Sequence, residues 1–176
     1  MRAFLFAAAL TLSACAAPGG TTVGTFLIAA DAATSLVVER MTVEETTFPA
    51  GEGMDPLVVL KLHRPDGRAL VFQQANHTPH DIFVQTAGGP LAQIMGLPED
   101  ASPLLYRATP QDNIGAPFLC APDGPLLIGY QARADGVVQI VGLKQEFQVE
   151  LRPDGQTEAV PYSPAQVCAR LQFRRS

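Results

Sequence analysis

The sequence predicts a mainly β protein, either an antiparallel β-sandwich or a partly closed barrel, with a short C-terminal helix. Turn sequences divide the chain into short apolar segments: RPDG occurs at 64–67 and 152–155, APDG at 121–124 and ADG at 134–136. Several of these segments alternate apolar and polar residues with a period of two, as half-buried strands do. Hydrophobic residues make up 47% of the 176 residues and charged residues 16%, which is typical of one packed domain.

The first predicted hairpin has strands at 57–64 and 68–74, joined by the RPDG turn. Val58, Leu60 and Leu62 share one face of its first strand, while Val59, Lys61 and His63 share the other. Further strands are predicted at 81–87, 117–121, 126–132 and 136–143, and in a segment where Phe147, Val149 and Leu151 face inward and Gln148, Glu150 and Arg152 face outward.

Helix signals are few. Ser163 can cap a C-terminal helix with Pro164 at its first position and Gln166 completing a capping box. The following VCARLQF also alternates, so a closing strand is the alternative. PLAQIMGL at 90–97 predicts one helical turn ended by Gly96. Residues 26–46 fit either a helix over the alanines or a strand over LVVERMTV.

The N-terminus has the pattern of an export signal. Arg2 precedes the apolar stretch at 3–11, which is far shorter than the roughly 20 residues of a membrane-spanning helix. Leu12-Ser13-Ala14-Cys15 then resembles the lipobox of bacterial lipoproteins. The resemblance implies that Cys15 becomes the first mature residue and carries the acyl chains, and that Ala16 after it directs the protein to the outer membrane.

This resemblance divides the chain into a signal peptide at 1–14, the lipidated Cys15 with a flexible tether at 15–25, and a single β-rich domain at 26–176. It implies a bacterial envelope location, lipid-anchored at the outer membrane and facing the periplasm. The alternatives are an ordinary signal peptide with a chance cysteine, or an apolar N-terminal strand that is buried in the domain.

Once Cys15 is assigned to lipid, Cys120 and Cys168 remain as a pair. Export places them in an oxidising compartment, where two thiols are expected to form a disulfide. They lack the C-x-x-C spacing of a redox site. The alternative is two separately buried thiols.

The segment NHTPHD at 76–81 holds His77 and His80 beside Asp81 and is the candidate metal site, for zinc or copper. A turn that collects polar residues for other reasons is the alternative, because H-x-x-H in a loop has no fixed geometry. His63 lies near the opposite end of its predicted hairpin, which argues against a three-histidine site.

The sequence contains no G-x-S-x-G, S-x-x-K, G-x-G-x-x-G or P-loop motif, so we predict neither an enzyme nor a cofactor. With a net charge of −5 and no basic stripe, nucleic acid is not an expected partner. We predict a membrane-anchored periplasmic lipoprotein that acts as a binding or scaffolding module, with membrane lipid held through Cys15 and an unidentified envelope protein as its partners. The loop at 76–81 and the connection at 86–103 are the candidate contact surfaces. The alternatives are a metal-binding lipoprotein using His77 and His80, or an envelope hydrolase.

Overall fold

The computed structural model describes residues 20–28, 40–49, 55–76, 78–153, 155, 157–160 and 162–175. The predicted signal peptide, Cys15 and His77 lie outside the described residues. Within the described part of the chain, no helix has the length and apolar character needed to cross a membrane.

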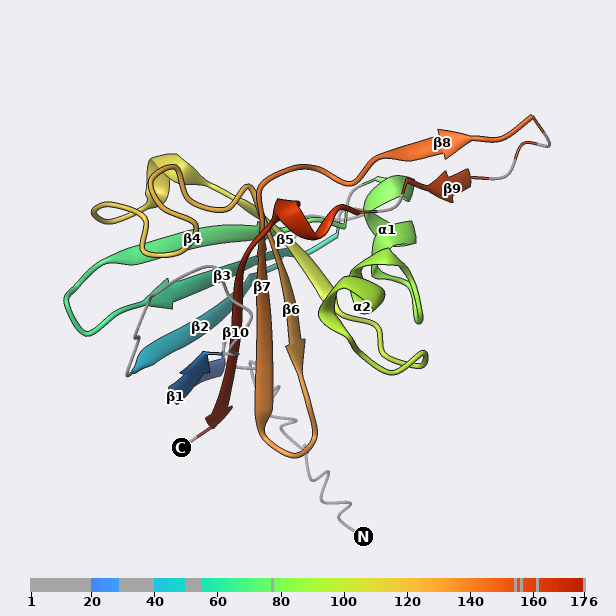
Figure 1. Cartoon of the computed structure of the whole chain (residues 1–176). Helices are drawn as coiled ribbons and strands as arrows, with labels where there is room; N and C mark the ends of the chain where they lie inside the picture. The colour runs from blue at the N-terminus through green and yellow to red at the C-terminus, as the bar shows by residue number, and fades with distance from the viewer. Residues whose placement is uncertain are drawn as a thin grey trace, which may run out of the picture.

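The described strands form one strongly curled antiparallel sheet (Figure 1). Seven of them, β2 to β7 and β10, curve into a half-barrel. Strand β1 pairs with β10 along one edge and with β2 along its other edge, and this pairing closes the barrel. The order around the barrel follows the chain, apart from a two-stranded ribbon inserted before β10. The barrel strands are β1 (Gly20–Ile28), β2 (Met41–Phe48), β3 (Leu57–His63), β4 (Ala69–Gln74), β5 (Leu104–Ala108), β6 (Leu127–Ala132), β7 (Val137–Leu143) and β10 (Val167–Arg175). The mainly β, antiparallel prediction is confirmed, in its barrel form.

Alternate residues of these strands fill the barrel interior. Leu60 and Leu62 of β3 are fully buried in the main hydrophobic core, and Val58 packs against it, as the period-two pattern predicts. Phe72 of β4 and Tyr106 of β5 belong to the same core. The Tyr106 hydroxyl donates to Glu45 Oε2 at 3.0 Å. Burial and the neighbouring Glu45 carboxylate raise the pKa of Tyr106, because both disfavour a phenolate there.

The prediction of a strand at 117–121 is wrong. This segment is an irregular part of the β5–β6 connection, although Phe118, Leu119 and Cys120 are buried in the main core. Phe118 lies beneath the guanidinium groups of Arg64 and Arg68, at 5.7 and 5.9 Å from its ring centroid. The segment is apolar because it covers the core, and it has no neighbouring strand with which to form a ladder.

The predicted disulfide is present between Cys120 and Cys168, whose Cα atoms lie 5.2 Å apart. It joins the β5–β6 connection to β10. Gly142 of β7 leaves the necessary room, since a Cβ atom there would lie 2.8 Å from Cys120 Sγ and 3.1 Å from Ala169 Cβ. Both contacts involve atoms that cannot easily move, so this position requires glycine.

Two short helices, α1 (Pro79–Gln85) and α2 (Pro90–Met95), lie on the outside of the barrel between β4 and β5 (Figure 1). Val84 and Leu91 pack in a second core with Leu105 and Leu127 of the barrel wall. Gly129 of β6 permits the close approach of α2, because a Cβ atom there would lie 2.7 Å from Leu91 Cδ1.

The helix α1 corrects the prediction of a strand at 81–87. Thr78 caps the helix by accepting from the Asp81 backbone N–H at 3.0 Å, and Pro79 occupies the first turn. Val84 of this segment packs onto the barrel wall, whereas Ile82 is exposed to solvent. The predicted helical turn at 90–97 is confirmed as α2, with Gly96 as its left-handed C-cap at φ 66°.

The predicted C-terminal helix is limited to one 3₁₀ turn, Pro164–Gln166, and the alternative closing strand is what forms. The capping interaction exists, since Gln166 Oε1 accepts from the Ser163 backbone N–H at 2.9 Å. The following residues pair with both β7 and β1, and these two ladders outweigh the local helix signal.

The predicted tether is too long. Strand β1 begins at Gly20, so residues 20–25 belong to the barrel and pair with β2 and β10. Of the two possibilities for residues 26–46, a strand is correct for Met41–Phe48. The segment at 29–39 lies outside the described residues.

The segment after β7 forms a ribbon of two strands, β8 (Val149–Leu151) and β9 (Thr157–Ala159), which projects from the barrel (Figure 1). The predicted strand around Phe147 therefore lies outside the barrel. Phe147 is buried and Gln148, Glu150 and Arg152 are exposed, as predicted. The orientation of the Val149 and Leu151 side chains lies outside what the structure describes.

Candidate functional site: a lateral groove

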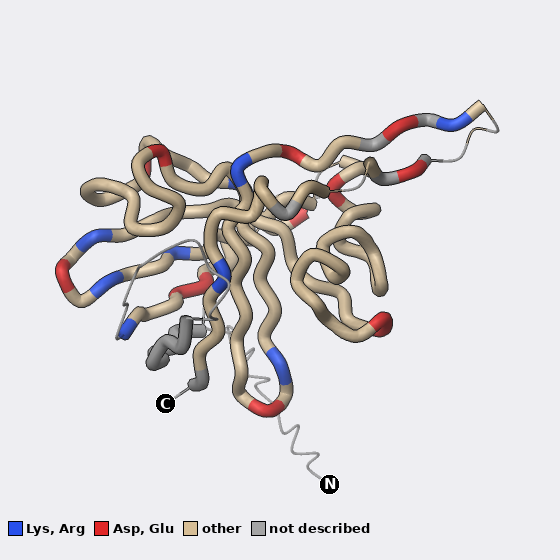
Figure 2. The backbone as a smooth tube through the Cα atoms, viewed as in Figure 1, with Lys and Arg blue, Asp and Glu red and all other residues tan. Residues whose placement is uncertain are grey.

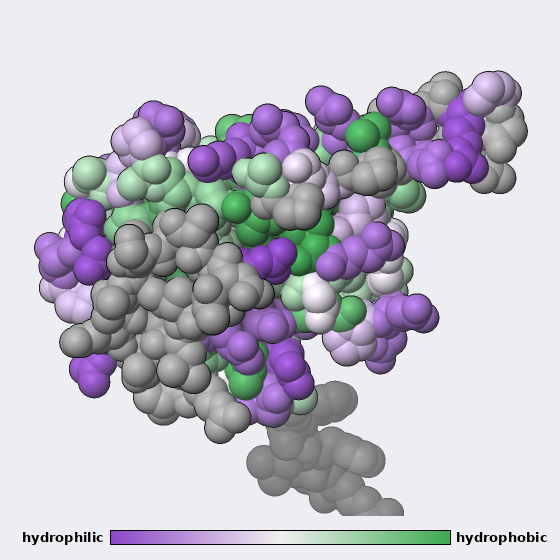
Figure 3. All heavy atoms as spheres, in the orientation of Figure 1, coloured by the Kyte–Doolittle hydropathy of each residue, from purple (hydrophilic) through white to green (hydrophobic). Residues whose placement is uncertain are grey.

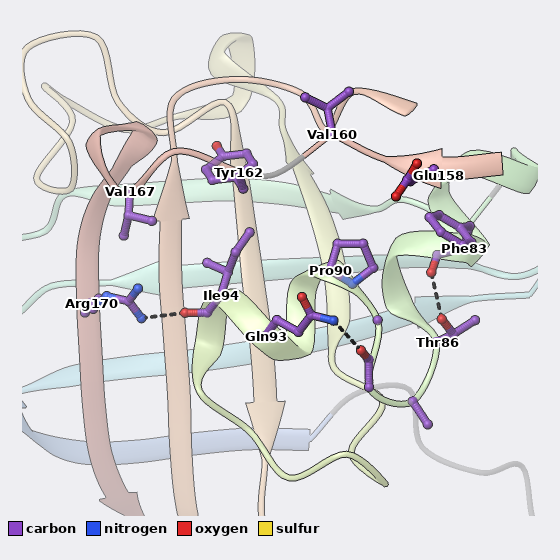
Figure 4. Close-up of a pocket in the computed structure, with 13 residues that line it drawn as sticks. Phe83, Thr86, Pro90, Gln93, Ile94, Glu158, Val160, Tyr162, Val167 and Arg170 are labelled. Carbon is purple, nitrogen blue, oxygen red and sulfur yellow. Dashed lines mark hydrogen bonds between the residues drawn. The ribbon is translucent and has the colours of Figure 1, made fainter. Parts of the chain in front are cut away.

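A groove of about 740 Å³ lies on the side of the barrel. We call it the lateral groove; helices α1 and α2 form one wall, and the chain from β9 to β10 forms the other (Figure 4). The space-filling view in Figure 3 shows hydrophobic atoms gathered between the root of the ribbon and the helices, with hydrophilic residues around them. An apolar centre with a polar rim is typical of binding surfaces.

The helical wall contributes Phe83, Pro90 and Ile94 as apolar surface. The two helices meet at a tight turn, where a Cβ atom on Gly89 would lie 2.8 Å from the Thr86 carbonyl oxygen. Gln93 Nε2 donates to the Gly88 carbonyl oxygen at 3.0 Å across this turn. This hydrogen bond stabilises the turn between the two helices, and the turn forms the base of the helical wall.

The other wall contributes Val160, Tyr162 and Val167 as apolar surface. Tyr162 packs against Phe147 with the ring centroids 5.0 Å apart, and its hydroxyl donates to the Gln145 carbonyl oxygen at 3.2 Å. These contacts attach the root of the ribbon to the second core. Partial burial raises the pKa of Tyr162, so its hydroxyl stays a neutral hydrogen-bond donor.

Arg170 of β10 connects the two walls. Its Nη1 donates to the Ile94 carbonyl oxygen at 2.8 Å, near the C-terminal end of α2 (Figure 4). A cation at this position satisfies a carbonyl that the end of a helix leaves unpaired, and it interacts favourably with the negative end of the helix dipole. The bond holds α2 against β10 and sets the spacing of the walls at this end.

A second ionic link joins α1, β5 and the root of the ribbon. Arg107 Nε and Nη2 each donate to an oxygen of Glu146 at 2.9 Å, and Nη2 lies 3.4 Å from Oδ1 of Asp81. Asp81 is 2% exposed, whereas Arg107 and Glu146 are partly exposed. The hydrogen bonds to Glu146, with the nearby Asp81 charge, raise the pKa of Arg107. The guanidinium therefore remains charged and compensates the buried carboxylate.

We expect Arg107→Met to lower the free energy of unfolding by about 1–3 kcal/mol, because it leaves the buried Asp81 carboxylate without its cation. Urea denaturation followed by circular dichroism measures the change. Adding Asp81→Asn to Arg107→Met should recover part of the loss, since no buried charge then remains. A double variant as unstable as the sum of the single variants would contradict this coupling.

Only part of the predicted metal site lies in the described part of the chain. His80 lies on α1, Asp81 is bound to Arg107, and His77 is outside the described residues. His63 lies on β3 beside Glu44, with its Nε2 3.3 Å from Glu44 Oε2, near the turn at the other end of the β3–β4 hairpin from Asn76. Among the described residues, no group of three or more His, Cys, Asp or Glu side chains could hold a metal ion. The histidine pair remains a prediction from the sequence.

The predicted contact surface at 86–103 does contribute to the groove, through residues 86–90, Gln93 and Ile94. Sequence reasoning missed Val160, Tyr162, Val167 and Arg170 on the opposite wall. Alternation in VCARLQF indicated a closing strand, which was the only available signal for their placement.

The fold and the groove define a small up-and-down β-barrel that carries a helix pair and a projecting ribbon on one side. No protein-family model, curated protein or solved structure matches this chain.

Proposed function

We propose that this protein is a lipoprotein of the bacterial envelope, anchored through acylated Cys15 at the outer membrane and facing the periplasm, and that it binds an envelope protein in the lateral groove. The anchor rests on the lipobox resemblance at Leu12–Cys15. The binding role rests on the groove itself, and we propose a binding or scaffolding module rather than an enzyme.

The observation that carries the binding role is the composition of the groove. Phe83, Ile94 and Tyr162 provide apolar and aromatic surface, and Glu158 and Gln93 provide exposed polar groups near them. Aromatic side chains and arginine are enriched where proteins contact one another, and Arg170 also borders this surface.

A photo-crosslinking amino acid at Ala87 tests this proposal in cells that express the full-length chain. Ala87 is exposed, lines the groove and makes no side-chain hydrogen bond, so the substitution leaves both walls intact. We expect a discrete crosslinked product with one envelope protein. Ala116 is the matched control, an exposed alanine in the β5–β6 connection, which lies away from the helices in Figure 1. No product at Ala87, or the same product at both positions, would overturn the binding role.

A further inference from the structure

We propose that the partner enters as an extended segment that adds a third strand to the ribbon along β9, and that its groove-facing side chains, which are every second residue, include a basic residue opposite Glu158 and an apolar residue opposite Val160. The inference rests on the proposed function, because it describes how the envelope protein occupies the groove. Four observations carry it: the free backbone edge of β9, the size of the ribbon, the face that β9 presents to the groove, and the charge of the ribbon.

The register of the ribbon shows which backbone groups of β9 are free. Val160 N–H donates to the Gln148 carbonyl oxygen at 2.9 Å, and Glu150 lies opposite Glu158 two residues further along. In an antiparallel pair, hydrogen-bonded and non-bonded positions alternate. Thr157 and Ala159 therefore occupy non-bonded positions, and their backbone N–H and C=O groups point away from β8. No strand pairs with this edge within the described residues.

A ribbon of two short strands is marginal on its own, since three or more strands are normally needed for a stable sheet. Each strand of this ribbon has three residues, and the ribbon projects from the barrel. A third strand would satisfy the free N–H and C=O groups of β9 and add a ladder to the ribbon. Strand addition of this kind is a common mode of peptide recognition.

The position of β9 places the added strand at the groove. Glu158 and Val160 line the groove together with Phe83 of α1 (Figure 4). Side chains opposite Glu158 and Val160 on an added strand would share their face of the sheet. Every second side chain of the partner would thus face the groove, where Glu158 favours a basic residue and Val160 with the helical wall favours apolar residues.

The charge of the ribbon selects a basic partner. The paired strands carry two acidic residues, Glu150 and Glu158, whereas Glu146 before them is already paired with Arg107. Figure 2 shows acidic residues along both strands. Glu150 lies directly opposite Glu158, and like charges in such a pair repel. Arg152 forms an ion pair with Glu158, so one cation serves two carboxylates on the same face, and a basic side chain of the partner opposite Glu158 would compensate the second negative charge. The same acidity disfavours pairing with the ribbon of a second copy.

Binding of a synthetic peptide that repeats Lys-Thr-Val-Thr to the purified full-length protein in detergent tests the inference, because lysine and valine then share one face of the added strand and threonine takes the other. Ala159→Pro removes an N–H that points to the free edge, and it leaves the bonds at Glu158 and Val160 to β8 in place. We expect it to weaken peptide binding by about tenfold. Leu151→Pro is the matched control, because the Leu151 N–H points to the opposite edge of the ribbon and its loss should leave binding unchanged. The same peptide with glutamate in place of lysine should not bind.

Equal loss of binding in both proline variants, or equal binding of the acidic and basic peptides, would overturn strand addition along β9. The in-cell crosslink from position 87 separates this failure from that of the proposed function. If the crosslink persists undiminished in Ala159→Pro, the groove binds a partner in another way and the inference is wrong. If the crosslink is absent from the otherwise unchanged chain, the proposed function itself is wrong.

Discussion

Replacing Cys15 with serine is expected to move the full-length protein from the membrane fraction to the soluble fraction. Each methylene group of an acyl chain buried in a bilayer contributes about 0.8 kcal/mol, so a protein that carries several chains is stably anchored and one without them is released. A serine hydroxyl at this position would not replace the thiol that the lipobox resemblance identifies as the acylation site. Fractionation of cell envelopes, with mass spectrometry of the N-terminal peptide, measures both location and acylation.

Ala16→Asp is the control for this experiment, because it changes the residue after the acylation site and keeps Cys15. It should remain in the membrane fraction and carry the same acyl mass. Sedimentation of Cys15→Ser with membranes at the wild-type level would contradict the anchor, and it would favour a buried N-terminal strand or an uncleaved signal.

Removing the disulfide should have the largest effect on stability. The bond joins residues 48 positions apart, and loop-closure entropy for a loop of this length predicts a loss of about 4 kcal/mol in Cys120→Ser/Cys168→Ser. The bond also holds the buried segment around Phe118 and Leu119 against β10, so its loss frees a part of the main core. Urea denaturation measures the midpoint with and without the two cysteines.

Cys15→Ser serves as the background for this measurement, because the expected soluble protein keeps Cys120 and Cys168. A reducing agent should shift this background toward the double variant and leave the double variant itself unchanged. Identical urea midpoints with and without the disulfide would contradict a stabilising role for the bond.

Local sequence patterns correctly predicted the elements whose structure depends on neighbouring residues. The RPDG turn and the alternation of Val58, Leu60 and Leu62 were sufficient for the β3–β4 hairpin, because a turn and a period-two pattern together set the register. Gly96 was sufficient to end α2, since few other residues adopt the left-handed conformation so readily. The pairing of Cys120 with Cys168 followed from assigning Cys15 to lipid.

Two of the wrongly predicted segments differ from the prediction for opposite reasons. The residues of α1 have strand-like composition, but Thr78 and Pro79 start a helix whose apolar side packs on the barrel wall. The residues after Pro164 have a helix signal, but their backbone pairs with two neighbouring strands. In both cases tertiary packing outweighed local preference, which amounts to less than about 1 kcal/mol per residue.

The sequence by itself was sufficient to predict the mainly β class, the lipid anchor at Cys15 and the disulfide pair, because each prediction depends on residues close together or on a count of cysteines. Only the tertiary structure decided the lateral groove and the free edge of β9. The groove brings Phe83 and Ile94 beside Tyr162 and Arg170, more than 60 residues later in the chain. These residues meet because β10 closes the barrel beside β7, and no local pattern encodes which strands become neighbours.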